Sequence, residues 1–393
     1  MTSQGLGATP AEPDSAALLQ AAAGAGAVVS QRLLETFRAD GLIPRPRRAG
    51  HRGRSPDWRY PHGTERQLLA LLRWRQRTKD PRLLRILLWL EGFPVPAAEV
   101  RGDLIHELQA MTRVIEREIG QHARQLGLEQ AGSSGRGPAI DALADTVAAK
   151  RGNTPVPRRS RVPASDRARA VSLIIRLFGL GEKIETTSQD AVLVEKVLGI
   201  APNGRRQTID GTGPWLTGPA EDLFNEAEIV ALPSLIEALT SASDAQLSTA
   251  RQIASIMFRH LPLMVRMLGA ISGDENYAGL AGLSQLDQHP ETAIYLIPMV
   301  IAMLRAGWAE NLEAVASALR PFPDLADKAQ HILGLPAATV EANLAGKPAE
   351  VRERAHRLID AAIEGQLDPG ANSWHRVGRA ETPTRGQASK PLP

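Results

Sequence analysis

Hydrophobic residues recur every three or four positions along most of this chain, and glycine or proline separates one such stretch from the next. This spacing places apolar side chains on one face of a helix. Near the N-terminal end the pattern predicts helices over 14–24 and 30–40, and beyond residue 63 it predicts two more that meet at Asp80 and Pro81. The alternation typical of half-buried strands is missing from the second half of the sequence. The chain is therefore expected to be mainly α.

A long helix is expected from Ala97 to about Gly127. Its apolar stripe contains Leu104, Leu108, Met111, Ile115, Ile119 and Leu126. A strict heptad would require apolar residues where Glu118, His122 and Gln125 stand, so the stripe follows the 3.6-residue period of a single helix and not the 3.5-residue period of a coiled coil. We expect this helix to pack within its domain or in a short antiparallel pair, which leaves homodimer formation open.

Changes in composition divide the chain into five parts. Residues 129–164 are rich in Gly, Ser, Pro and Arg and are interpreted as a flexible linker with one weak helical piece around Ile140 to Ala149. This linker separates an N-terminal unit at 13–128 from an all-α effector or oligomerisation domain at 165–366. The two ends, 1–12 and 367–393, are expected to be disordered.

Charge is distributed unevenly between the two units. Residues 1–163 hold 25 Lys and Arg against 16 Asp and Glu, whereas residues 164–393 hold 21 against 27. Most of the excess lies between Arg32 and Arg85, where 15 cations meet 5 anions. Such a basic segment is typical of contact with phosphates, because neutralised phosphates release condensed counterions.

Residues 14–60 combine two short helices with an arginine-rich arm. Glycines separate the helices, and Ser30 is expected to cap the second, which turns Leu34 and Phe37 inward. Trp58 and Tyr60 stand two positions apart, as on one face of a strand, so the arm is predicted to form a small β-wing. The candidate DNA-contacting residues on the second helix and the wing are Gln31, Arg32, Glu35, Arg38, Arg45, Arg47, Arg48, Arg52, Arg54, Arg59 and Tyr60.

The string VSQRLLETFRADGLIP at Val29–Pro44, followed by the arginine-rich arm and a helix pair, resembles the winged helix-turn-helix of MerR-type transcriptional regulators. The resemblance covers about 80 residues and implies a fold with a DNA-reading second helix and a wing. Two departures concern chemistry. Glu35 stands where the family commonly has a basic residue, and the cysteines of the metal- and thiol-sensing members are absent.

Several other classes of function find no motif in the sequence. The chain contains no cysteine, which excludes a catalytic thiol, a disulfide scaffold and cysteine-based metal sites. The glycine-rich segment 204–218 lacks the Gly-Lys-Ser/Thr ending of a phosphate-binding loop. No cofactor, metal site or enzyme activity is predicted. No leader or membrane-spanning run is recognised, so a cytoplasmic, nucleoid-associated protein without membrane contact is expected.

These patterns predict an N-terminal winged helix-turn-helix with a minimal β-wing, followed by a linker and a larger all-α C-terminal domain. Gln31 and Arg32 would enter the major groove of double-stranded DNA while the wing contacts phosphates. The helical domain would respond to an unknown small-molecule or protein effector. The main hypothesis is a sequence-selective DNA-binding transcriptional regulator. The alternative is a protein–protein interaction module with a degenerate winged helix, and Glu35 is its best argument.

Overall fold

The computed structural model describes residues 12–52, 55–128, 132–149, 162–198, 227–272, 289–322 and 337–363. Within these ranges the chain is mainly helical, with a single two-stranded antiparallel sheet. The predicted mainly α class is confirmed. The ends expected to be disordered lie outside the described residues, apart from Glu12. No helix in these ranges is long and apolar enough to cross a membrane.

The first four helices and the sheet form the part of the molecule that we call the head. Side chains cap its helices as the sequence predicts: the Asp14 carboxylate accepts a hydrogen bond from the backbone N–H of Ala17, and Ser30 Oγ accepts one from Leu33 at 3.2 Å. Glycines at positive φ, Gly26 and Gly41, follow the first two helices. The elements are α1 (Ser15–Gly24), α2 (Gln31–Ala39), β1 (Arg47–Arg52), β2 (Ser55–Arg59), α3 (Thr64–Trp74) and α4 (Pro81–Leu90).

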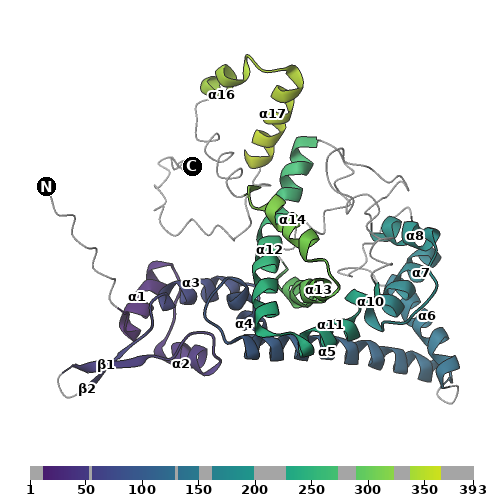
Figure 1. Cartoon of the computed structure of the whole chain (residues 1–393), viewed down its shortest axis with the longest axis horizontal. Coiled ribbons are helices and arrows are strands. Elements are labelled where there is room, and N and C mark those ends of the chain that lie inside the picture. Colours follow the sequence, from purple (N-terminus) through teal and green to yellow (C-terminus); the bar gives the residue numbers. More distant parts are fainter. Residues whose placement is uncertain are drawn as a thin grey trace, which may run out of the picture.

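The helix α5 (Ala97–Gln125) runs from the head along the lower edge of the molecule to a lobe at the far end (Figure 1). The far lobe contains α6 (Ser133–Ala149), α7 (Ala164–Ile174), η2 (Ile175–Gly179), α8 (Ser188–Leu198) and α10 (Ala227–Val230). The helices stacked on the middle of α5 are α11 (Leu232–Ser241), α12 (Asp244–Ser272), η6 (Pro290–Thr292), α13 (Ala293–Arg305) and α14 (Ala309–Leu319). Two further helices, α16 (Ala337–Leu344) and α17 (Ala349–Ile363), lie beyond the upper end of α12 (Figure 1).

One hydrophobic core passes through the head and the middle of the molecule. It includes Leu18 and Phe37 of the head together with Leu239 and Ile297 of the middle helices. The ring of Trp74 in α3 lies 6.2 Å from that of Phe258 in α12. The sequence analysis places residues 13–128 and 165–366 in separate units, but α4 and α5 of the first pack on α11, α12 and α13 of the second. The head is therefore packed on the rest of the chain as part of a common core.

Part of the segment interpreted as a flexible linker is helical and extends the weak helical piece expected at 140–149. Residues 133–149 form α6, which packs on both α5 and α7. Ala139 and Ile140 are fully buried and contact the cluster around Ile119 of α5. Small residues give this segment the composition of a linker, but they also allow helices to approach closely. Residues 129–131 and 150–161 of the same segment lie outside the described ranges.

Candidate nucleic-acid interface

The outer face of α2 is polar. Leu34 and Phe37 are buried in the core, whereas Gln31, Arg32 and Glu35 are exposed. At about 100° per residue, the three polar positions span an arc of about 100° on the side opposite the buried pair. The helix thus offers a donor and acceptor amide, a cation and a carboxylate on one exposed surface.

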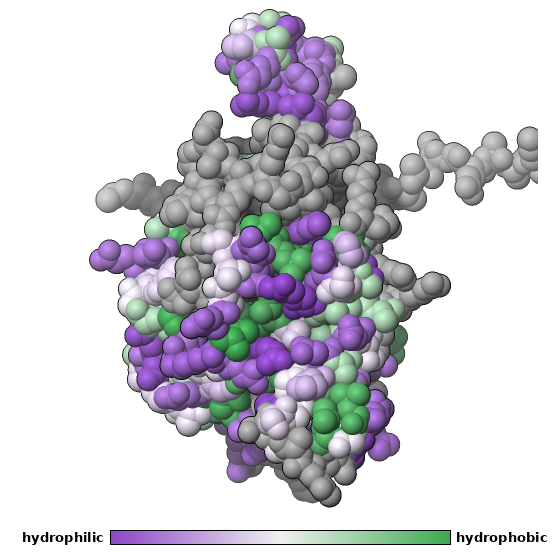
Figure 2. Space-filling model, turned by 90° about the vertical axis from the view of Figure 1, so that its right-hand side faces the viewer, coloured by the Kyte–Doolittle hydropathy of each residue, from purple (hydrophilic) through white to green (hydrophobic). Residues whose placement is uncertain are grey.

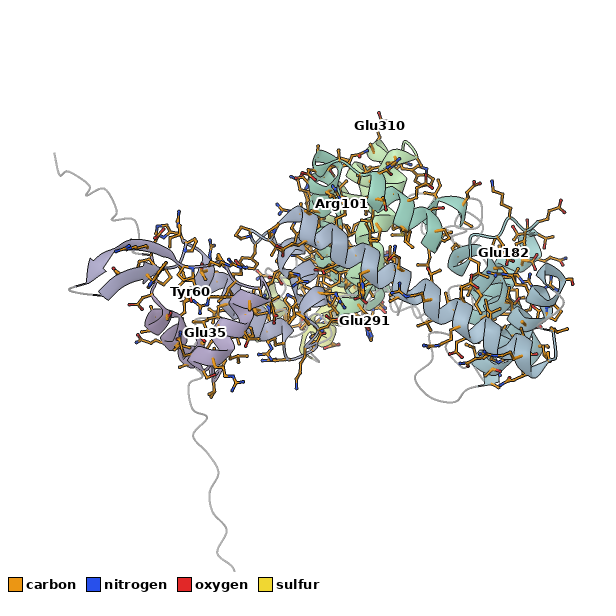
Figure 3. The ribbon with its side chains drawn as sticks, turned by 90° about the horizontal axis from the view of Figure 1, so that it is seen from below. Glu35, Tyr60, Arg101, Glu182, Glu291 and Glu310 are labelled. Carbon is orange, nitrogen blue, oxygen red and sulfur yellow. The ribbon has the colours of Figure 1, made fainter. Side chains whose placement is uncertain are left out.

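Glu35 is held by its neighbours on α2. Its Oε1 accepts a hydrogen bond from Gln31 Nε2 at 3.2 Å and lies 3.7 Å from Arg38 Nη2. Figure 3 labels Glu35 on the head, at the opposite end of the molecule from Glu182 of the far lobe. The carboxylate side chain is 52% exposed. Its charge is thus partly balanced within α2, which reduces the repulsion that a carboxylate would exert on nearby phosphates.

The strands β1 and β2 form a hairpin that projects from the head, away from the helices (Figures 1 and 3). Arg47 pairs with Arg59 and Arg48 with Trp58, and a bulge lies between Arg48 and Gly50. The predicted β-hairpin is thus present in the fold. Residues 53–54, which include Arg54, lie outside the described ranges, and nothing is described of the Arg52 side chain.

Acidic residues balance some of the arginines of this hairpin. Arg47 forms an ion pair with Glu12 at 2.8 Å. Arg59 forms one with Asp57 at 3.0 Å, lies 3.7 Å from Asp14, and is only 26% exposed. The positive charge expected for the hairpin is therefore partly neutralised at Arg47 and Arg59.

Other candidate cations remain accessible. Arg32, Arg45 and Arg48 are exposed. Among the described residues, the guanidinium groups of Arg32 and Arg45 have no hydrogen-bond or ion-pair partner. Arg32 lies near the N-terminal end of α2 and Arg45 just before β1, so the two cations flank the segment between helix and hairpin.

Tyr60 is a correction to the predicted contact residues. Its side chain is fully buried in the core of the head, and its backbone N–H donates to the carbonyl of Pro13 at 2.8 Å. The strand ends at Arg59, so the alternation that would place Tyr60 on the same face as Trp58 stops one residue earlier. Trp58 is 50% exposed, whereas Tyr60 anchors the base of the hairpin.

The buried hydroxyl of Tyr60 has no hydrogen-bond partner among the described residues. We expect Tyr60→Phe to leave the free energy of unfolding unchanged or to raise it by about 1 kcal/mol, because the phenyl ring keeps the packing and removes an unpaired polar group. Urea unfolding followed by circular dichroism measures this difference. A loss above about 1 kcal/mol would show that the hydroxyl has a partner, and a loss of DNA binding would return Tyr60 to the interface.

Arg85 is a residue of this region that the sequence pattern did not single out. Its Nε and Nη2 donate to the two oxygens of Asp103 at 2.7 and 2.8 Å, and Nη1 donates to the carbonyl of Asp40, just after α2. The hydrogen bond with Asp103 is the main reason why the pKa of Arg85 is raised. Arg85 lies at a hollow of about 380 Å³ that is also lined by Arg38, Arg45 and Glu99. An arginine inside a leucine-rich run, RLLRILL, was the available sign in the sequence.

A second buried charge cluster connects α3 and α4 with α12. Glu91 follows α4 with a side chain only 4% exposed, and it accepts hydrogen bonds from Trp74 Nε1 and, at 3.2 Å, from Arg73. Burial raises its pKa to about 7, and it outweighs the opposing effects of Arg73, Trp74 and Arg259. Burial also disfavours the charged form of Arg259, and the pKa of this guanidinium is therefore lowered. The junction of the head with α12 therefore contains a carboxyl group that titrates near neutral pH.

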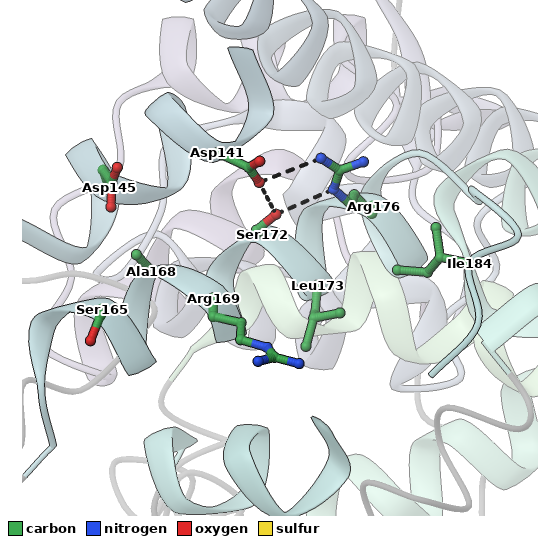
Figure 4. Close-up of a pocket in the computed structure, with 9 residues that line it drawn as sticks. All are labelled: Asp141, Asp145, Ser165, Ala168, Arg169, Ser172, Leu173, Arg176 and Ile184. Atoms are coloured by element: carbon green, nitrogen blue, oxygen red, sulfur yellow. Dashed lines mark hydrogen bonds and ion pairs between the residues drawn. The ribbon is translucent and has the colours of Figure 1, made fainter. Parts of the chain in front are cut away.

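A larger hollow, of about 510 Å³, lies in the far lobe (Figure 4). Ser172 donates to Asp141 at 2.7 Å, and Arg176 donates to Ser172 and Asp141 at 3.3 and 3.4 Å. Arg169, which also lines the hollow, pairs with Asp190. The end of the molecule that carries this lobe has a surface of mixed polar and apolar side chains (Figure 2). The arginines of this hollow are thus already paired with residues of the chain.

Comparisons of the chain with family models, with curated proteins and with solved structures gave no match. Among the described residues, no group of three or more His, Asp or Glu side chains is placed to hold a metal ion.

Proposed function

We propose that the head binds double-stranded DNA and that the chain is a sequence-selective transcriptional regulator. In this proposal α2 lies in the major groove and the hairpin follows the phosphate backbone beside it. The observation that carries the proposal is the exposed polar face of α2 next to a projecting hairpin, where the guanidinium groups of Arg32 on α2 and Arg45 before β1 have no partner among the described residues.

The chemistry of the exposed groups suits this assignment. An arginine can donate two hydrogen bonds to a guanine edge, a glutamine can pair with adenine, and a carboxylate can accept from the cytosine amino group. Arg32, Gln31 and Glu35 supply these three groups on one helix face. The arginines at positions 45 and 48 are exposed where phosphates would pass.

The test compares single arginine replacements in the full chain. Arg32→Ala is expected to weaken binding to a selected duplex about 10-fold to 100-fold, because a bidentate base contact contributes about 1–3 kcal/mol of discrimination. Arg352→Ala, which removes another exposed arginine from α17, serves as the control and should leave affinity unchanged. Equal affinities of the wild type and Arg32→Ala would contradict the assignment of α2.

A second function is favoured by the ion pairs of the hairpin. Because Arg47 and Arg59 are paired with Glu12, Asp57 and Asp14, part of the expected cationic surface is neutralised. A winged helix with this balance of charge could dock on another protein in place of DNA. Failure of the wild-type chain to retain any duplex at low salt would favour this alternative.

A further inference from the structure

Three arginines lie in a row on the exposed side of α5. Arg113, Arg117 and Arg124 are all exposed, and Arg117 retains 62% of its side-chain surface. At about 100° per residue they fall within an arc of about 40°. Figure 3 views the molecule from below, with α5 nearest the reader. We call these three residues the α5 stripe.

The acidic residues of α5 are turned toward other partners. Asp103 binds Arg85, Glu107 lies 3.8 Å from Arg82, and Glu116 binds Arg136 of α6 at 2.8 Å. Glu99 lies against the turn at Gly41. Glu118 is the exception, because its carboxylate lies 3.7 Å from Arg117 of the stripe. Apart from Glu118, the carboxylates of α5 thus face partners in the head and in α6, whereas the three stripe arginines face outward.

Within the described residues, Arg117 is the one stripe arginine that forms an ion pair, with Glu118. Among the described residues, Arg113 and Arg124 form no ion pair. Gly120 lies between Arg117 and Arg124 on the same side, and beyond its two neighbours and the backbone of α5 itself no described atom lies within 4 Å of where its Cβ would be. A glycine inside a helix costs about 1 kcal/mol relative to alanine. Because Gly120 has no side chain, another molecule can approach the helix backbone closely at the point between Arg117 and Arg124.

A polyanion with regularly spaced charges fits this surface. A polyanion bound to the head could extend along α5 to the stripe. From Asp103, which binds Arg85 of the head, to Arg124 is a distance of about 32 Å at 1.5 Å per residue. Duplex DNA covers this distance in roughly 9 base pairs and carries about one charge per 1.7 Å of its axis. Both α2 and α5 lie along the lower edge of the molecule in Figure 1.

We propose that the α5 stripe binds the phosphate backbone of DNA flanking the segment read by the head. This inference rests on the proposed function and adds a second contact surface to it. The contact with α5 would lengthen the segment of DNA that the protein occupies. The exposed side of this helix is then a nucleic-acid contact and not a dimer seam.

The experiment measures the affinity of the full chain for two duplexes: one trimmed to the shortest length that the head retains, and one extended by about 10 base pairs on each side. Replacing Arg113, Arg117 and Arg124 together by glutamine should weaken binding to the long duplex at least about tenfold. The plot of log affinity against log salt concentration should become less steep by about 2–3, since each phosphate contact contributes about 0.9 to the steepness. Affinity for the short duplex should stay the same.

The matched control replaces Arg352, Arg354 and Arg357 of α17 by glutamine, which removes the same charge from another exposed helix. This control should bind both duplexes like the wild type. An unchanged affinity of the α5 variant for the long duplex, or an equal loss on both lengths, would overturn the inference while leaving the head's function intact. If the wild type binds neither duplex, the proposed function fails and the inference fails with it.

Discussion

Replacing Asp103 by alanine is expected to lower the free energy of unfolding by about 3–5 kcal/mol, because it leaves the Arg85 guanidinium without its carboxylate in a largely buried place. The two side chains are 10% and 17% exposed, and both oxygens of Asp103 accept hydrogen bonds from Arg85. Urea unfolding of the full chain measures the loss. The pair joins α4 to α5, and Arg85 also holds the turn after α2. The effect should therefore extend to the geometry of the proposed reading helix.

Glu107→Ala is the matched control for this prediction. Glu107 lies one turn further along α5, and its contact with Arg82 is 3.8 Å long with the arginine 44% exposed. A solvent-exposed pair of this kind contributes about 0–1 kcal/mol. A loss below about 1 kcal/mol for Asp103→Ala, similar to the control, would show that Arg85 finds other partners at no cost.

The second large effect concerns the dependence of stability on pH. Since burial raises the pKa of Glu91 to about 7 in the folded chain, from an ordinary value of 4.5, the folded state holds a proton that the unfolded state has released between these pH values. This contribution to stability is complete below pH 4.5 and is lost as the pH rises to about 7. A shift of this size corresponds to about 3 kcal/mol.

Glu91→Gln should remove this part of the pH dependence. The amide keeps the shape of the side chain and cannot ionise, so the difference in unfolding free energy between the wild type and the variant should change steadily from pH 5 to pH 7.5. Glu310→Gln, an exposed replacement on α14, should run parallel to the wild type. Parallel curves for Glu91→Gln and the wild type would show that Glu91 does not titrate in this range.

Local features of the fold could be predicted from the sequence because they depend on neighbouring residues. The caps at Asp14 and Ser30, the glycine turns and the hairpin are of this kind. The burial of Tyr60 could not be predicted from its spacing, since it depends on where the strand ends and on the core beneath it. Within the segment interpreted as a linker, α6 begins at Ser133, earlier than the weak helical pattern at 140–149 indicates, because burial against α5 stabilises the helix in a way that the local sequence does not show.

The candidate interface was predicted in part. The exposed side of α2 follows directly from helical spacing, and Gln31, Arg32 and Glu35 are found there. The neutralised state of Arg47 and Arg59 was not foreseen, because Glu12 and Asp14 approach the hairpin only through the fold. The importance of Arg85 and Glu91 was hidden for the same reason, since their burial and partners come from packing of α3, α4, α5 and α12.

The most direct test of DNA binding by the head is the affinity of the full chain for duplex DNA as a function of salt. We predict that the logarithm of the affinity falls linearly with the logarithm of salt concentration, with a slope of about −0.9 for each phosphate contacted. A selected sequence should bind tighter than a random one at every salt concentration. Absence of duplex binding at about 50 mM salt, or an affinity independent of both salt and sequence, would contradict it.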